Sequence, residues 1–321
     1  MVDGVAVEDC EEGVMVKRVV FAMVVALLPL EGVARLWVHF DPTSDLREQI
    51  MTWDADPEIL FRPRPGLGEY YDAGPINALG LRGPDVDPIA PHRVLMVGDS
   101  VGFAIHVPDV DGMARRSERQ LGDGWQVMNA SVIGYQTWQE RRYLERLDPI
   151  LAPTEVVVVF CTNDTSKRSQ MVEWSAYYRR QEPVLDSVVR SPVALITASR
   201  YVAALRESAV IRREIEAHPP ALAWRGEWSD AWASLMLRAA RAGRPAVALL
   251  VPSELQLDRG DAETNADARR MAEDAGVRVV DLLPAFRAEP RGTLFLPNDG
   301  IHLSARGHAI AADAIVAALA Q

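Results

Sequence analysis

The chain has 321 residues, of which 49% are hydrophobic, so it can bury a large core in one domain or two. Its formal net charge is −11 and its arginines form no long basic block, which argues against the concentrated positive face that nucleic acid requires. Its two cysteines, Cys10 and Cys161, fit neither a disulfide framework nor a Cys/His metal site. We therefore expect no nucleic-acid partner, no metal and no other cofactor.

The first 40 residues contain an apolar run that predicts a membrane anchor. Lys17 and Arg18 precede this run, which covers residues 19–30 and must extend further to reach the roughly 20 residues of a bilayer span. Positive charges on this flank keep it in the cytoplasm and export the rest of the chain, and no small-residue cleavage site is evident. We therefore predict a leader with an uncleaved anchor over residues 1–40 and a catalytic domain outside the cytoplasm.

There are two alternatives to a membrane anchor. One is a secreted protein, and the other is a cytoplasmic protein in which the apolar run is a buried helix. The acidic start of the chain is unusual before such a run, and we expect translation to begin at Met15.

Residues 41–92 are rich in Pro, Gly and Asp, which predicts a lead-in segment with little regular structure. From residue 93 onward, short apolar runs alternate with amphipathic segments. Unbroken Val/Leu runs are typical of strands buried on both faces of a parallel sheet. Such strands are predicted at 94–97, 125–130, 155–160, 246–251 and 277–283. Helices are predicted at 113–121, 137–147, 230–242, 262–275 and 304–320, the last capped by Ser304.

This alternation predicts a three-layer α/β sandwich, in which sites form at the carboxyl ends of the strands. The stretch 165–228 interrupts the alternation as an aromatic-rich insertion. It lies at the same sheet edge as Asn163, where it would form a lid or a substrate wall; alternatively, its aromatic side chains pack it onto the domain. We therefore expect one domain over residues 93–321 that includes this insertion.

Ser100 is the candidate nucleophile, because it ends the triplet Gly98-Asp99-Ser100 directly after the first buried strand. A hydrolytic serine also needs a base and a group that orients the base. The segment Asp299-Gly-Ile-His302, near the other end of the chain, offers His302 and Asp299 for these roles. Asp99 is expected to hold the nucleophile turn through backbone hydrogen bonds.

Acyl transfer also needs hydrogen-bond donors that stabilise the developing oxyanion. Gly134 follows the second predicted strand, where glycine lets a backbone N–H approach a substrate closely. Asn163 follows the third strand and offers a side-chain N–H. The alternative is that Gly134 is an ordinary turn glycine and Asn163 an Asx turn.

Four segments together resemble the four sequence blocks of the SGNH, or GDSL-type, hydrolases. They are Val97–Ser100, Asn129–Gly134, Thr162–Asp164 and Asp299–His302. Residues 303–308 also match the family, and residues 77–83 match members that carry an N-terminal membrane segment. The resemblance covers residue 93 to the C-terminus apart from the insertion. One departure is Cys161, where the family usually has glycine; the larger side chain is expected to narrow the pocket or shift Asn163.

The resemblance implies a flavodoxin-like fold with a five-stranded parallel sheet in the order 2-1-3-4-5, and ester hydrolysis without a metal. It implies that Ser100 is the nucleophile, His302 the general base and Asp299 the residue that orients it. It also implies an oxyanion hole formed by the backbone N–H of Ser100, the backbone N–H of Gly134 and the side chain of Asn163.

The expected function is therefore hydrolysis of a short, acetyl-like O-acyl ester through a covalent acyl-enzyme. A small-molecule or glycan ester of the cell envelope is the expected substrate, by location and family analogy. One alternative is an O-acyltransferase that passes the acyl group to a sugar hydroxyl. Another is a catalytically silent carbohydrate-binding protein, which has no evident need for all four residue types of the site.

Overall fold

The computed structural model describes residues 50–69, 74–165, 225–259, 263–290, 292–297 and 299–320. Within these ranges, no helix has both the length and the hydropathy to cross a bilayer. The predicted anchor and most of the predicted insertion lie outside the described residues.

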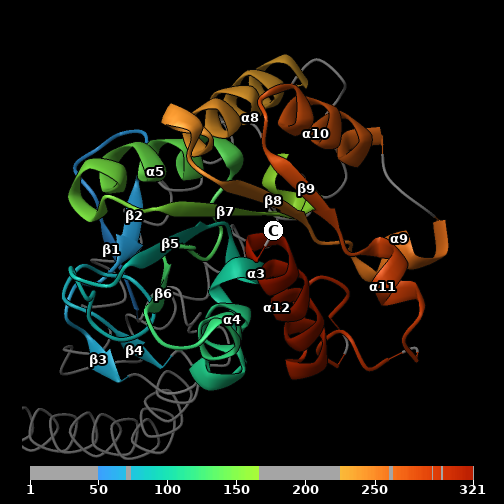
Figure 1. The fold of residues 1–321 in the computed structure, drawn as a ribbon. Helices are drawn as coiled ribbons and strands as arrows, with labels where there is room; N and C mark the ends of the chain where they lie inside the picture. Colours follow the sequence, from blue (N-terminus) through green and yellow to red (C-terminus); the bar gives the residue numbers. More distant parts are fainter. Residues whose placement is uncertain are drawn as a thin grey trace, which may run out of the picture. The chain divides into compact units, whose positions relative to one another are not determined.

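A five-stranded parallel sheet forms the centre of the described fold (Figure 1). Its strands are β5 His92–Val97, β6 Trp125–Asn129, β7 Glu155–Phe160, β8 Ala246–Leu250 and β9 Arg278–Asp281. They lie in the order β6-β5-β7-β8-β9, which is 2-1-3-4-5 in chain order and confirms the predicted topology. Every residue of β7 and β8 is buried, as expected for unbroken apolar strands covered on both faces.

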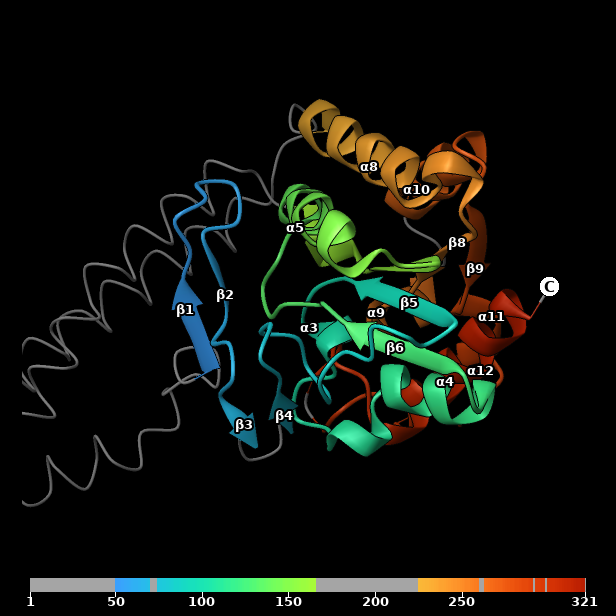
Figure 2. The same cartoon turned by 60° about the vertical axis from the view of Figure 1, so that its left-hand side comes forward.

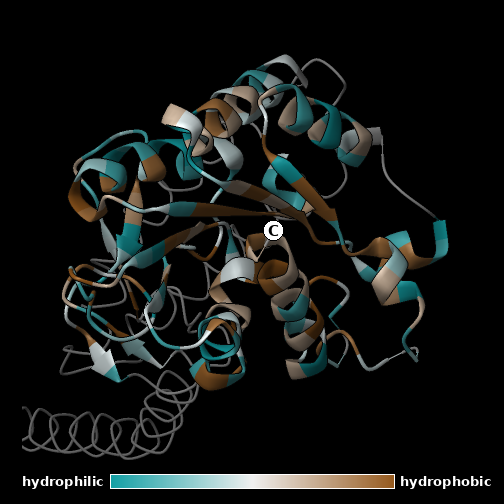
Figure 3. Ribbon diagram, viewed as in Figure 1, coloured by the Kyte–Doolittle hydropathy of each residue, from teal (hydrophilic) through white to brown (hydrophobic). Residues whose placement is uncertain are grey.

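Helices form the two outer layers. On one face lie α5 Thr137–Leu151, α8 Arg225–Ala239 and α10 Glu263–Asp274; on the other lie α4 Met113–Leu121 and α12 Ala305–Leu319 (Figure 1). Shorter helices are α3 Ser100–Phe103, α9 Glu254–Arg259 and α11 Leu283–Arg287, with 3₁₀ turns at Asp109–Asp111, Thr162–Thr165 and Arg241–Gly243. Hydrophobic residues concentrate in the strands (Figure 3). Side chains such as Val157, Leu249 and Ile315 are 0–1% exposed and form the core between the layers.

Helix α5 is longer than its sequence predicts, because it continues through Pro149 to Leu151 instead of ending at residue 147. Proline has no N–H to donate to the carbonyl four residues earlier, which belongs to Glu145. Arg238 of α8 donates to that carbonyl from Nη2 at 3.2 Å. Packing against α8 therefore satisfies the group that Pro149 leaves unbonded, and the helix continues.

The lead-in segment has more regular structure than its composition predicts. Strand β1 Met51–Trp53 pairs antiparallel with β2 Phe61–Pro63, and β3 Gly68–Glu69 pairs with β4 Pro75–Ile76. These strands belong to the same unit of the chain as the parallel sheet. The β1–β2 hairpin lies beyond the arrowheads of β5 and β6, at the carboxyl edge of the sheet (Figure 2). Strands of two or three residues are too short to produce a hydropathy pattern, so the sequence did not reveal them.

Residues 166–224 of the predicted insertion lie outside the described residues, but its last residues do not. Residues 225–228 already belong to α8, and Trp228 packs its ring 5.9 Å from that of Phe160 on β7 and 6.4 Å from that of Trp232. This aromatic side chain therefore packs onto the domain. A lid or substrate wall formed by the rest of the insertion stays a prediction.

Candidate active site

Ser100 is the first residue of α3, and only Gly98 and Asp99 separate it from the end of β5. The carboxylate Oδ1 of Asp99 accepts a hydrogen bond from the backbone N–H of Val101 at 2.8 Å, which caps the short helix as expected. Glycine is required at position 102, because a Cβ there would lie 2.4 Å from the Oγ of Ser131. The nucleophile turn is thus held by its own cap and by close packing against the next loop.

Ser100 and His302 are 202 positions apart in sequence and hydrogen-bonded in the structure. The Nε2 of His302 lies 2.9 Å from the Oγ of Ser100, and its Nδ1 lies 2.6 Å from Oδ2 of Asp299. The other carboxylate oxygen of Asp299 accepts the backbone N–H groups of Ile301 and His302, at 2.9 and 3.0 Å. A serine, a histidine and an oriented carboxylate in this order have the geometry of an activated nucleophile.

The hydrogen bonds around Asp299 determine its charge. Partial burial by itself raises the pKa of this carboxyl group, but hydrogen bonds from His302 and from the backbone N–H of Ile301 outweigh burial and hold the pKa below its usual value. Asp299 is therefore a carboxylate at neutral pH. As an acceptor only, it fixes the proton of the neutral imidazole on Nδ1 and leaves the lone pair of Nε2 facing Ser100.

The predicted oxyanion donors follow the carboxyl ends of β5, β6 and β7. Gly134 has a φ of +79°, in the left-handed region that favours glycine. Within the described residues, the backbone N–H groups of Ser100 and Gly134 donate to no other group. The Nδ2 of Asn163 donates to Oδ2 of Asp99 at 2.7 Å, which leaves its second N–H for a substrate. The Oγ of Ser100 also lies 3.3 Å from the same Oδ2 of Asp99, so hydrogen bonds join Asn163 through Asp99 to Ser100, His302 and Asp299. No side-chain hydrogen bond joins Gly134 to this group, because glycine has no side chain.

Comparison with known proteins decides the family. The family model of the GDSL-like lipase/acylhydrolases matches residues 96–310, about two thirds of the chain. The chain belongs to this family. It is an SGNH-type hydrolase that acts on acyl esters. No curated protein matches it.

Several solved structures are similar to this hydrolase. TesA is 17% identical, with 71% of this chain and 98% of TesA covered and a TM-score of 0.45. LAE5, an α/β hydrolase from the metagenome of Lake Arreo, is 18% identical, with 72% and 96% covered and a TM-score of 0.46. A W215I variant of Axe2, an acetyl xylan esterase from Geobacillus stearothermophilus, is 15% identical, with 72% and 95% covered and a TM-score of 0.46.

Three carboxyl groups are buried close together in the hydrolase: Asp99, Glu140 and Asp164, each at most 1% exposed. Burial, together with the charge of Asp99, raises the pKa of Glu140 well above its usual value. Burial, Asp99 and Glu140 raise the pKa of Asp164 in the same way. Asp99 accepts hydrogen bonds from the backbone N–H of Val101 on Oδ1 and from Nδ2 of Asn163 on Oδ2. Burial therefore favours the protonated forms of Glu140 and Asp164.

We predict that Glu140→Gln becomes increasingly stabilising as the pH rises. A glutamate ionises near pH 4.3 in the unfolded chain, and burial raises the pKa of Glu140 in the folded one, so between the two pKa values the wild type loses roughly 1.4 kcal/mol of stability per pH unit from this group. Glutamine has a similar shape and does not titrate. Urea unfolding of both proteins at pH 5, 6.5 and 8 measures the difference, with Glu273→Gln on the exposed side of α10 as the control. A difference that stays constant with pH contradicts the prediction.

Two further residues named by the sequence are buried. Cys161 is 1% exposed, and burial raises the pKa of its thiol well above the usual value, so the thiol stays protonated and unreactive. His308 on α12 is also 1% exposed, and burial together with Arg82 and Arg116 lowers its pKa to about 3. It is therefore a neutral packing residue at physiological pH.

Sequence reasoning assigned no role to Arg82 or Glu140. Arg82 is 2% exposed, and its guanidinium donates to the carbonyls of Phe103, Ala104 and Val107, which lie at and just after the end of α3. A signal for Arg82 was present, because it lies in the 77–83 segment that resembles the family. Glu140 also had one, since it shares a helix face with Tyr143, Leu144 and Leu147 at intervals of three, four and seven residues. A carboxyl group on such an apolar face is buried away from water, so its ionised form is not solvated.

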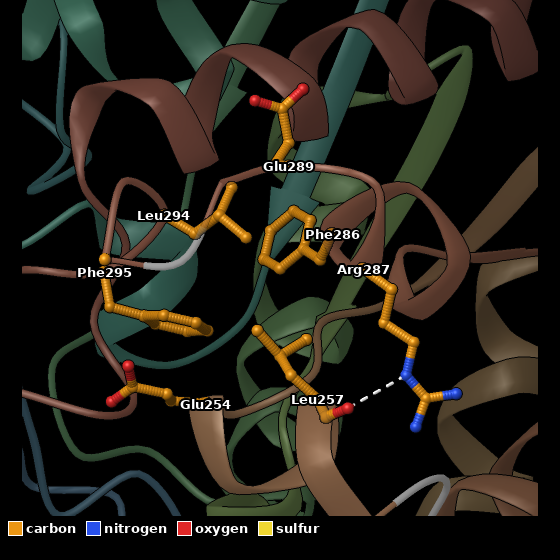
Figure 4. Close-up of a pocket in the computed structure, with 8 residues that line it drawn as sticks. Glu254, Leu257, Phe286, Arg287, Glu289, Leu294 and Phe295 are labelled. Atoms are coloured by element: carbon orange, nitrogen blue, oxygen red, sulfur yellow. Dashed lines mark hydrogen bonds between the residues drawn. The ribbon is translucent and has the colours of Figure 1, made fainter.

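A small pocket of about 40 Å³, partly open to solvent, lies between α9, α11 and the loop before α12 (Figure 4). Leu257 and Phe286 form part of its lining. The backbone N–H of Glu254 donates to the carbonyl of Gly300 at 2.7 Å, so the pocket lies behind the loop that carries Asp299 and His302. Its one lining arginine, Arg287, donates from Nε to the carbonyl of Leu257 at 3.0 Å. None of the predicted site residues lines this pocket, so it is not the candidate active site. The residues around it pack against the loop that carries Asp299 and His302.

Proposed function

We propose that the hydrolase works through a covalent acyl-enzyme on Ser100. His302 takes the hydroxyl proton on Nε2 as the Oγ of Ser100 attacks the ester carbonyl, and then gives that proton to the leaving alcohol. Water next attacks the acyl-enzyme, with His302 again as the base, which releases the acid and regenerates Ser100. Asp299 orients the imidazole and stabilises its protonated form. The 2.9 Å contact between Ser100 and His302, with Asp299 at 2.6 Å on the opposite ring nitrogen, carries this proposal.

The tetrahedral intermediate places a negative charge on the former carbonyl oxygen. The backbone N–H groups of Ser100 and Gly134 and the free N–H of Asn163 are the donors we assign to it. They come from three loops at one sheet edge, so the charge meets fixed dipoles instead of water that must reorient.

Asn163→Ala is expected to lower kcat by about 10²- to 10³-fold, the usual effect of losing one oxyanion donor. KM should change little, since the donor acts on charge that develops only in the transition state. Steady-state kinetics on a chromogenic ester measure both constants. A loss of only a few-fold contradicts the assignment and leaves Asn163 as a residue of the β7 turn.

The substrate and location proposed are a short-chain O-acyl ester on a cell-envelope glycan and a membrane-anchored domain outside the cytoplasm. The apolar run at residues 19–30, preceded by Lys17 and Arg18, supports the location. The substrate class is inferred from this location and by analogy with the family.

The test is covalent labelling of the full chain with a fluorophosphonate, followed by mass spectrometry of the modified peptide. Labelling at Ser100 that disappears in His302→Ala is the expected result. A folded protein that is not labelled, or is labelled elsewhere, overturns the proposal and favours a catalytically silent binding protein. Acetyl, butyryl and octanoyl esters offered with and without sugar acceptors then measure the chain length and distinguish hydrolysis from acyl transfer.

A further inference from the structure

The loop that carries Gly134, residues 130–136, is called here the oxyanion loop. At its start it is tied to the strand of the nucleophile, because the backbone N–H of Ala130 donates to Met96 at 2.8 Å and that of Val132 donates to Gly98 at 2.9 Å. These bonds continue the pairing of β6 with β5 past the end of the strands. The first half of the oxyanion loop is therefore fixed by the central sheet.

The second half of the oxyanion loop is tied to the β1–β2 hairpin, which lies far earlier in the chain. The hydroxyl of Tyr135, next to Gly134, donates to the backbone carbonyl of Phe61 at 2.6 Å. The rings of Tyr135 and Phe61 pack with centroids 5.5 Å apart. Burial raises the pKa of the Tyr135 hydroxyl far above 10, so it keeps its proton and remains a donor at any working pH.

Gln139 connects the same hairpin to the first turn of α5. Its side-chain Oε1 accepts the backbone N–H of Gln136 at 3.2 Å, and its Nε2 donates to the carbonyl of Ile59 at 2.9 Å. Gln139 is fully buried. The carbonyl oxygen and the amide nitrogen of this one side chain thus join the end of the oxyanion loop to the hairpin.

Ion pairs hold the hairpin on α5. Its turn presents three acidic residues, and α5 presents three arginines opposite them. The pairs are Asp54–Arg146 at 2.8 Å, Asp56–Arg142 at 2.9 Å and Glu58–Arg141 at 3.2 Å. The side chain of Asp54 is only 6% exposed, and it also accepts a hydrogen bond from Arg62 at 2.8 Å. Several partly buried pairs in one network stabilise a contact more than an isolated surface pair does.

We propose that the β1–β2 hairpin is a built part of the catalytic unit, in which Tyr135 and Gln139 act as positioning residues that hold Gly134 in the geometry of the oxyanion hole. The hairpin precedes residues 96–310, which the family model matches, so this hydrolase uses a segment outside the shared domain to complete its site. The inference rests on the proposed function, because it assumes that the N–H of Gly134 meets the oxyanion.

Tyr135→Phe tests the proposal, because it removes one hydroxyl and keeps the ring. We expect kcat to fall about 10- to 100-fold with KM within about twofold, since a small misplacement of a transition-state donor has effects of that size. The rate of inactivation by the fluorophosphonate should fall in parallel. Tyr143→Phe is the matched control: its hydroxyl is also buried, has no hydrogen-bond partner in the described residues, and its ring lies 5.7 Å from that of Tyr135. It should keep the wild-type kcat.

The proposal is overturned if Tyr135→Phe lowers the melting temperature but keeps kcat within twofold, because the hydroxyl is then merely structural. If Tyr135→Phe fails to fold, Asp54→Asn replaces it; this change loosens the hairpin at a distance and should lower kcat several-fold without changing KM. Wild-type kcat in Asp54→Asn then overturns the proposal. Ser100→Ala is assayed beside them. If Ser100→Ala remains active, both the proposed function and the role of the hairpin are overturned. If Ser100→Ala is inactive and Tyr135→Phe is fully active, only the role of the hairpin is overturned.

Discussion

Ser100→Ala is expected to lower kcat by about 10⁶-fold, the size of loss seen when a serine nucleophile that acts together with its base is removed. Without the Oγ no acyl-enzyme forms, and His302 at 2.9 Å has no hydroxyl to deprotonate. The fold should remain intact, because Asp99 still caps α3 through the Val101 N–H and Gly102 still packs on Ser131. Initial rates on an activated ester, measured at high enzyme concentration, give the residual kcat.

Ser117→Ala is the control for this substitution. Ser117 on α4 is fully buried, and its Oγ has no hydrogen-bond partner among the described residues, so the same chemical change is made away from the site. It should leave kcat within twofold of wild type. Turnover well above background in a folded Ser100→Ala would mean that another residue is the nucleophile.

Asp299→Asn is expected to lower kcat by about 10⁴-fold with its geometry nearly unchanged. An amide nitrogen facing Nδ1 would make the imidazole place its proton on Nε2, where it can no longer accept the proton of Ser100. An amide also lacks the charge that stabilises the protonated imidazole. Circular dichroism and melting temperature check the fold, and Asp267→Asn, which removes only an exposed ion pair with Arg270 on α10, is the control.

The pH dependence of this variant follows from the sign of the Asp299 pKa shift. Its folded-state pKa lies below the ordinary value, so the carboxylate contributes stability above about pH 3.9 and loses that contribution as the pH falls through the folded-state pKa. The difference in stability from wild type should shrink below pH 4. Urea unfolding of both proteins between pH 2 and 5 measures the difference, and a difference that stays the same over this range would contradict the lowered pKa of Asp299.

The elements of the parallel sheet could be predicted because their signal is local. The run Glu155–Phe160 is apolar after its first residue, and in the structure it is β7 with the same bounds. Met113–Leu121 is α4, as predicted, and Ser304 caps α12 by accepting the backbone N–H groups of Arg306 and Gly307. The strand order 2-1-3-4-5 has no local signal, and it came from the resemblance of four short segments to a known family.

Other elements depend on partners that are distant in sequence. The end of α5 depends on Arg238, which donates to the carbonyl that Pro149 leaves free. The β1–β2 hairpin depends on arginines of α5 that lie more than 80 positions later. Secondary-structure propensity depends only on a residue and its neighbours in sequence, so it cannot predict either of these long-range contacts.

The sequence by itself determined which chemical groups the hydrolase has available: a serine after a buried strand, an aspartate and histidine three positions apart, and a glycine and an asparagine after two further strands. Only the tertiary structure decided how they meet. It placed His302 between Ser100 and Asp299, turned the amide of Asn163 toward Asp99, and surrounded Asp99 with the buried acids Glu140 and Asp164. The physical reason is that hydrogen-bond distances and desolvation depend on which loops the parallel sheet brings to one edge, and that packing is a property of the whole chain.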